Sequence, residues 1–281
     1  MGNIFTILFV QPITNLLVVI YHALLFLHIP SPLGFAIILL TIIIRVALFP
    51  LMATQLKSSK KMQEVSPLLS KLREQYKGNP QRIQAETMAL YKQYGINPAA
   101  GCLPLVVQLP VIWGLYSVLQ QVVKLTSLPA LNKLIYSDGM KLHHLWDTHF
   151  FGIPLGQSPS QLLATVGFLI LVLPLLTAVS QFIQSKMMLP STPPTPPQDK
   201  KKGSATDFAS AFQTQSLYIF PLMIGFFSFR FPVGLSFYWI TFTFFGIIQQ
   251  YLMQRGTSSS VGALPIEVKI TKKTSKARKK K

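Results

Sequence analysis

The chain has 281 residues, of which 50% are hydrophobic and only 12% are charged. Soluble domains carry about 25% charged residues, and here the charges leave uncharged stretches of about 20 residues, which is the length that crosses a bilayer. A soluble globular enzyme is therefore nearly excluded. The single cysteine, Cys102, argues against an internal disulfide framework and a cysteine-based zinc site. We expect no cofactor.

The N-terminal region, 1–32, contains a long apolar run. Gln11, Asn15 and His22 fall on one helical face within it. This pattern predicts an amphipathic helix lying on the outer face of the membrane. The alternative is an additional membrane span, because the run also meets the length criterion.

The apolar runs that follow predict five spans separated by charged or polar connections. The predicted spans are 33–55, 101–123, 160–185 and two within 215–253, and the connections are 56–100, 124–159, 186–214 and the tail 254–281. Three of these connections hold 21 of the 26 Lys and Arg residues, namely 56–100, 186–214 and the tail. Connections rich in Lys and Arg lie in the cytoplasm. The N-terminus and loop 124–159 are then external, and the C-terminus is cytoplasmic.

The basic segment 56–100 predicts a helical hairpin with its turn at Gly78-Asn79-Pro80. Its first helix carries an apolar stripe with spacing of three and four residues, formed by Met62, Val65, Leu69, Leu72 and Tyr76. The stripe has two interpretations. It packs the two helices against each other, or it offers a landing surface to an incoming apolar chain.

Arg45 is the one charged residue inside a predicted span. A guanidinium at the centre of a bilayer costs at least about 2.5–3.5 kcal/mol, and it does not lose its proton. No span offers a carboxylate partner, so we expect a water-filled, positively charged groove that favours an acidic visitor. Uncharged polar side chains are available to line it: Thr41, Gln108, Ser180, Gln181, Gln184, Tyr238, Trp239 and Thr241. The alternative is a structural arginine bonded to carbonyls at a helix end.

Several separated motifs resemble those of a known family. They are Asn97-Pro98-Ala99-Ala100-Gly101-Cys102-Leu103-Pro104 with Gln108-Leu109-Pro110 and Leu115-Tyr116, Phe231-Pro232-Val233-Gly234-Leu235-Ser236-Phe237-Tyr238-Trp239 with Gln249-Gln250, Arg45 with Leu48-Phe49-Pro50, and Leu90-Tyr91-Lys92 with Tyr94. In order and spacing they resemble the YidC/Oxa family of membrane-protein insertases over about residues 1–255. The resemblance is to the short forms, which lack a large external domain.

This resemblance implies an all-α integral membrane protein with five spans around a hydrophilic groove, an N-terminal interfacial helix and a cytoplasmic helical hairpin. It implies that Arg45 draws in the hydrophilic, often acidic, flank of a nascent membrane protein, whose apolar segment then passes into lipid. The implied groove residues are Arg45, Thr41, Gln108, Gln181, Tyr238 and Trp239, with Gln184 as the alternative to Gln181. The implied location is the bacterial plasma membrane, with the thylakoid membrane as the alternative.

The tail concentrates basic residues near the C-terminus. They are Lys269, Lys272, Lys273, Lys276, Arg278, Lys279, Lys280 and Lys281. Such blocks bind polyanions or anionic lipids, so the ribosome and membrane lipids are both expected partners, and the Sec translocon is a further candidate.

The sequence contains no nucleotide-binding loop and no catalytic constellation, so we expect an ATP-independent protein rather than an enzyme. Two other functions remain as alternatives. One is a solute channel or anion transporter that uses Arg45, and the other is a passive scaffold for membrane-protein assembly.

Overall fold

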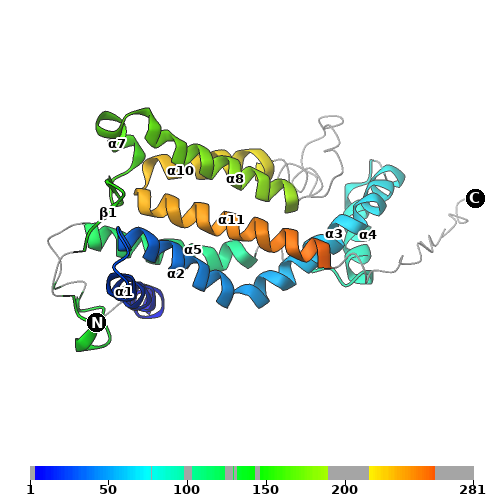
Figure 1. The fold of residues 1–281 in the computed structure, drawn as a ribbon. Coiled ribbons are helices and arrows are strands. Elements are labelled where there is room, and N and C mark those ends of the chain that lie inside the picture. Colours follow the sequence, from blue (N-terminus) through cyan, green and yellow to red (C-terminus); the bar gives the residue numbers. More distant parts are fainter. Residues whose placement is uncertain are drawn as a thin grey trace, which may run out of the picture.

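The computed structural model describes residues 4–76, 78–97, 103–123, 129, 132–142, 146–188 and 215–256, and these residues are mostly helical. In chain order the elements are η1 (Thr6–Val10), α1 (Gln11–Phe26), α2 (Pro32–Ala47), α3 (Phe49–Gln75), α4 (Pro80–Gln93), α5 (Leu103–Val123), η3 (Asp138–Met140), β1 (His149–Phe150), β2 (Ile153–Pro154), α7 (Pro159–Val166), η4 (Phe168–Leu171), α8 (Val172–Met188), η5 (Gln215–Ile219), α10 (Phe220–Arg230) and α11 (Val233–Gly256). Helices α2, α5, α8, α10 and α11 run lengthwise beside one another (Figure 1). Helices α3 and α4 form one end of this bundle, the α3–α4 end, and α7, β1 and β2 form the other, the β1–β2 end.

Within the bundle, α8 packs against α10 and α11, and α11 packs against α2. Among the described residues, two helices are long and apolar enough to cross a membrane, Thr6–Phe26 and Phe168–Met188. The bent pair α2 and α3 adds a third if it forms one span, and Leu217–Arg230 is a shorter apolar helix. The structure thus agrees with a helical membrane protein, while the arrangement of five spans stays a prediction.

The first predicted span is bent in the structure. α2 ends at Ala47, α3 begins at Phe49, and the two helices differ in direction by 62°. Pro50 in the first turn of α3 has no N–H, and its ring would clash with the carbonyl four residues earlier if one helix continued through it. Further on, α3 ends at Gln75, and the side chain of Asn79 accepts a hydrogen bond from the main-chain N–H of Arg82 to start α4.

The third predicted span, 160–185, is interrupted near its start. Ser158 and Gln161 form a capping box that begins the short helix α7. α7 ends just before Gly167, whose φ of +77° is outside the range of a right-handed helix. Glycine is suited to this position because a residue with a side chain seldom adopts a positive φ. The helix of membrane length therefore begins at Phe168 and extends to Met188, not at residue 160.

Helix α1 crosses the direction of the bundle, since Figure 1 shows it nearly end-on while α2 runs across the picture. Its outward surface is largely apolar, with Val19 and Phe26 exposed. The helix face that was predicted to be polar does not lie wholly on the outside of the protein. Asn15 is buried and bonds to the loop after α5, donating to the carbonyl of Leu134 and accepting from the main-chain N–H of Tyr136 at 2.8 Å each. This crossing orientation favours an interfacial helix, although the length of Thr6–Phe26 would also allow a span.

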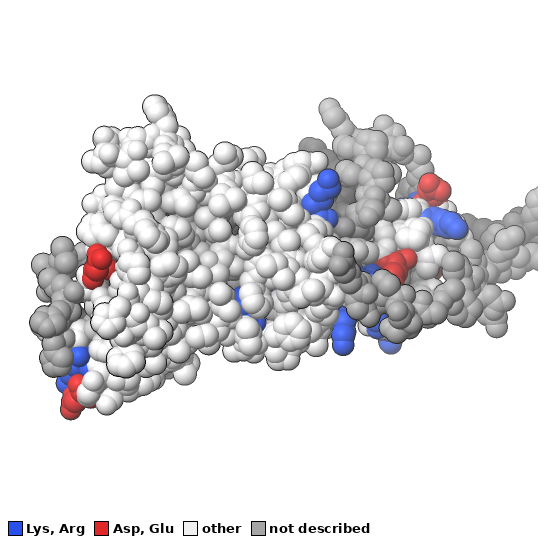
Figure 2. All heavy atoms as spheres, in the orientation of Figure 1, with Lys and Arg blue, Asp and Glu red and all other residues white. Residues whose placement is uncertain are grey.

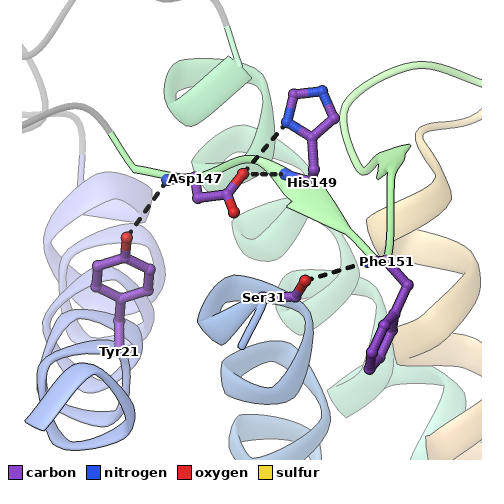
Figure 3. Close-up of polar contacts among 5 residues, drawn as sticks. All are labelled: Tyr21, Ser31, Asp147, His149 and Phe151. Atoms are coloured by element: carbon purple, nitrogen blue, oxygen red, sulfur yellow. Dashed lines mark hydrogen bonds and ion pairs between the residues drawn. The ribbon is translucent and has the colours of Figure 1, made fainter. Parts of the chain in front are cut away.

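The β1–β2 end is held by hydrogen bonds between distant segments (Figure 3). The main-chain N–H of Asp147 contacts the hydroxyl of Tyr21 on α1 at 3.4 Å, and the N–H of Phe151 donates to Ser31, just before α2, at 3.1 Å. The Asp147 carboxylate accepts from the main-chain N–H of His149 at 3.0 Å and lies 3.2 Å from its Nδ1. These contacts tie the strand pair to the first two helices.

The C-terminal end of α8 is capped by two glutamine side chains from other helices. The Nε2 of Gln250 on α11 donates to the carbonyl of Met187 at 2.6 Å. The Nε2 of Gln63 on α3 reaches the carbonyls of Met187 and Met188 at 3.3 and 3.1 Å. The last carbonyls of a helix lack partners within that helix. The two amides supply such partners and join α3, α8 and α11 at the α3–α4 end.

We expect Gln250→Ala to lower the free energy of unfolding by about 1–2 kcal/mol, because the carbonyl of Met187 loses its shortest partner in a buried setting. Denaturation of the purified protein in detergent measures this effect. The matched control is Gln93→Ala, at an exposed position on α4, which should change stability by less than about 0.5 kcal/mol. Equal effects of the two substitutions would contradict a specific role for the Gln250 cap.

Candidate functional site

Arg45 lies near the C-terminal end of α2 and is only 3% exposed. Its Nε and Nη2 atoms donate to the main-chain carbonyl of Phe242, at 3.1 and 2.7 Å. The guanidinium carbon lies 3.5 Å from the centroid of the Phe242 ring. Because a helix carbonyl has a second lone pair, Phe242 can serve both its own helix and Arg45.

This arrangement corrects two expectations. In this conformation the protein's own groups enclose the guanidinium, whereas the sequence predicted a hydrated cation without a partner. The partner is a carbonyl, as the structural alternative proposed, but it lies inside α11 and not at a helix end, since α11 continues to Gly256.

The charge of Arg45 is only partly compensated. Within the described residues, the two ion pairs are Asp138–Lys141 and Asp147–His149, and Arg45 takes part in neither. Figure 2 shows that charged side chains gather toward the two ends of the molecule and that the visible surface between them is almost entirely uncharged. A carbonyl and an aromatic ring offer only partial negative charge, whereas an anion would add the attraction between two full opposite charges. An anionic group near Arg45 would therefore be favoured.

The space beside Arg45 depends on Gly246 of α11. A Cβ atom added there would lie 2.5 Å from Nη2 of Arg45 and 2.2 Å from Nε2 of Gln184. The amide of Gln184 on α8 and the guanidinium thus meet at this glycine. Gln181, the residue favoured by the sequence, instead accepts from the hydroxyl of Thr243 at 3.4 Å. The geometry places Gln184 beside the charge.

Two other predicted residues connect to Arg45 through Phe242. The amide of Gln108 on α5 donates to the hydroxyl of Tyr238 on α11. The ring of Tyr238, which is 1% exposed, stacks on the ring of Phe242 with 5.8 Å between centroids. Gln108, Tyr238, Phe242 and Arg45 therefore form one connected series across α5, α11 and α2.

Thr41 and Trp239 are both buried, and within the described residues neither forms a hydrogen bond or ring contact with a member of this series. The hydroxyl of Thr41 donates to the carbonyl of Ile37 in its own helix at 2.7 Å. Trp239 is 6% exposed. In this conformation the hydroxyl of Thr41 therefore serves its own helix and does not stabilise the charge of Arg45.

Phe242 and Gly246 were missed by the sequence reasoning. Phe242 is one of 20 phenylalanines, and its contribution is partly a main-chain carbonyl, which every residue has. Gly246 follows Phe244 and Phe245 in an apolar run that predicts a helix. Glycine is less favourable than alanine inside a helix, so its presence there was a signal that the sequence offered.

The apolar stripe of the helical hairpin is packed inward. Val65 and Leu69 on α3 form a small core with Ile96, and partly buried side chains such as Met62 and Leu90 pack against it. This favours the packing interpretation of the stripe over the landing surface. The basic tail residues 269–281 lie outside the described residues, as do 98–102 of the motif before α5.

Residues 25–260 match the family model described as "60Kd inner membrane protein". The chain belongs to the YidC/Oxa family. The family resemblance predicted from the motifs is thereby confirmed, and the chain is a helical membrane protein of this family.

Named relatives agree with this membership. The chain is 34% identical over 250 residues to "Membrane protein insertase YidC 2" of Bacillus anthracis, covering 88% of this chain and 79% of the relative. It is 31% identical over 225 residues to "Membrane protein insertase MisCA" of Bacillus subtilis, covering 79% and 70%. It is 34% identical over 253 residues to "Inner membrane protein ALBINO3, chloroplastic" of Arabidopsis thaliana, covering 81% of this chain but about half, 48%, of that relative.

Proposed function

We propose that this YidC/Oxa protein is an ATP-independent membrane-protein insertase. It passes the hydrophilic flank of a nascent membrane protein past Arg45 and releases the apolar segment into lipid. Family membership supports the general function. The observation that carries the mechanism is a buried guanidinium that, among the described residues, is compensated by a carbonyl and a ring and by no carboxylate.

The proposed topology follows the charges. Most of the Lys and Arg residues that the structure describes lie at the α3–α4 end, which we place in the cytoplasm, so the β1–β2 end is external. Helices α5 and α11, with 21 and 24 residues, are long enough to cross about 30 Å of hydrocarbon at 1.5 Å per residue. With α8, α10 and the segment formed by α2 and the start of α3, they make five spans, and α1 lies at the external interface.

The polar flank of the client is the part that resists entry, because unpaired polar groups are costly in hydrocarbon. Arg45, Gln184 and Gln108 offer it hydrogen-bond donors at membrane depth. An acidic flank that moves outward also gains about 2.3 kcal/mol per charge per 100 mV of membrane potential. The apolar segment of the client, about 20 residues, gains free energy by leaving water for lipid.

The client leaves sideways, along the apolar outward surfaces of α8 and α10. Leu175 on α8 and Leu222 on α10 are 65% and 70% exposed, which suits lipid or a client helix. Nascent membrane proteins and lipids are the partners of this site. The ribosome, bound through the basic tail and the hairpin, and the Sec translocon are proposed as further partners.

The test is reconstitution of the purified chain in liposomes with a single-span client that has an acidic flank. A photoreactive amino acid at Gln108 or Gln184 should crosslink to the client during insertion. The same probe at Phe26, an exposed position on α1, is the control and should not. A flank that crosslinks but is still cleaved by protease added outside the liposomes has not crossed the bilayer, and this result would indicate a scaffold. Flux of a specific anion without any client would indicate a transporter, and either result would overturn the proposal.

A further inference from the structure

The Phe242 carbonyl occupies the position that an anionic ligand of Arg45 would take. Both nitrogens that donate to it, Nε and Nη2, belong to the edge of the guanidinium that commonly binds a carboxylate. The ring of the same residue covers the guanidinium face. Phe242 thus engages one edge and one face of Arg45 simultaneously.

We propose that Phe242 holds Arg45 in a closed resting position, and that an acidic segment of the client must displace the Phe242 carbonyl to bind Arg45. This inference rests on the insertase function proposed above. It makes Phe242 a positioning residue that competes with an acidic flank for Arg45 and so limits the preference for acidic over neutral flanks. The bonds from Arg45 to the carbonyl already have a charged donor. A carboxylate can replace the carbonyl because it adds a full negative charge, whereas a neutral flank offers Arg45 no such gain.

Gly246 makes this resting position sterically accessible. The Arg45 Nη2 and Gln184 Nε2 atoms both lie within 2.5 Å of the point where a side chain at residue 246 would begin. Any residue other than glycine would push both of these polar ends away. Both are the ends of flexible side chains, so Gly246→Ala should move them without preventing folding.

The resting contact is also coupled to the rest of the site. Phe242 stacks on Tyr238, whose hydroxyl accepts from Gln108. When Arg45 leaves Phe242, the ring loses its cation, and the stacked pair is free to shift. The effect of an acidic group that binds Arg45 would thereby be transmitted to Gln108 on α5, at the other end of the series.

Two variants test the proposal. Phe242→Leu keeps the carbonyl but removes the ring, and Gly246→Ala displaces both the guanidinium and the neighbouring amide. The matched control is Phe244→Leu, the same substitution on the same helix at a residue that is 55% exposed.

The first measurement uses no client. Phenylglyoxal, a reagent for guanidinium groups, modifies the purified protein, and mass spectrometry compares the rates at Arg45 and at the exposed Arg82.

We expect slow modification of Arg45 in the natural chain and in Phe244→Leu, and modification about three- to tenfold faster in Phe242→Leu and Gly246→Ala, in line with the loss of a cation–π contact. The second measurement compares insertion of two clients that differ only in an acidic or neutral flank. The ratio of acidic to neutral insertion rates should rise about three- to tenfold in Phe242→Leu.

Unchanged reactivity of Arg45 in both variants would show that neither the Phe242 ring nor the space at Gly246 keeps Arg45 in this position, and would overturn the proposal. Higher reactivity with an unchanged ratio of rates would overturn the displacement step. Failure of the natural chain to insert either client would contradict the insertase function, while the reactivity of Arg45 would still decide whether Phe242 restrains it. If the rise in the ratio of acidic to neutral insertion rates in Phe242→Leu acts through the guanidinium, it should vanish when Arg45 is also replaced by alanine.

Discussion

Replacing Arg45 with alanine is expected to slow insertion of clients with an acidic flank by about tenfold or more. Hydrogen bonds to a charged group contribute about 1.5–3 kcal/mol, and alanine removes both the bonds and the charge. The folded protein should not become less stable. The substitution removes a buried cation that has no ion-pair partner in the described part of the chain, and the Phe242 carbonyl keeps its acceptor role within α11.

Insertion into liposomes and the Tm in detergent, measured on the same preparations, separate these two effects. Arg45→Lys is the matched variant and should retain more activity than alanine, because the attraction of an acidic flank depends on positive charge more than on the shape of the guanidinium. A full insertion rate in Arg45→Ala would exclude an electrostatic role for this residue. A large loss of Tm with unchanged insertion would make it a structural arginine.

The second large effect is expected at Gly34 near the N-terminal end of α2. A Cβ atom at this position would lie 2.0–2.6 Å from three atoms of the Phe150 ring. That ring cannot easily move, because it packs against Phe35, Phe151 and Phe237 with centroid distances of 4.8–5.2 Å. Gly34→Ala should therefore lower the free energy of unfolding by about 2–3 kcal/mol, the usual cost of overpacking.

Unfolding in detergent measures this change, and two further variants define its cause. Gly139→Ala is the control, since the nearest heavy atom to an added Cβ is 4.0 Å away, on Ser137. Phe150→Ala vacates the space, so Gly34→Ala should cost little in that background. Additive effects of the Gly34 and Phe150 substitutions in a double-mutant cycle would rule out the steric explanation.

Much of the helical organisation could be predicted from local sequence signals. Asn79-Pro80 marks the start of α4 because an asparagine side chain caps a helix and proline suits its first turn. The break at Gly167 and the capping box at Ser158 and Gln161 had signals of the same kind, but the span 160–185 was predicted from its apolar run without them. Hydrophobicity alone does not reveal where a backbone changes direction.

The candidate site could be predicted only in part. Arg45 stands out because an ionisable residue in an apolar run is rare and costly. Gln184 was considered only as an alternative to Gln181, because both lie near the end of one helix and their direction depends on packing. Phe242 has no sequence signal, since its bond to Arg45 joins residues 197 apart through a main-chain carbonyl.

Composition and the order of charged and apolar segments by themselves determined that this chain is a helical membrane protein, and its motifs indicated the family. These properties follow from residue types and their spacing, which the sequence states directly. The tertiary structure alone decided that the Arg45 guanidinium turns toward Phe242, that Asn15 faces a loop instead of water, and that Gly34 accommodates Phe150. Such pairings depend on which helix faces meet across the fold, and no local pattern encodes that.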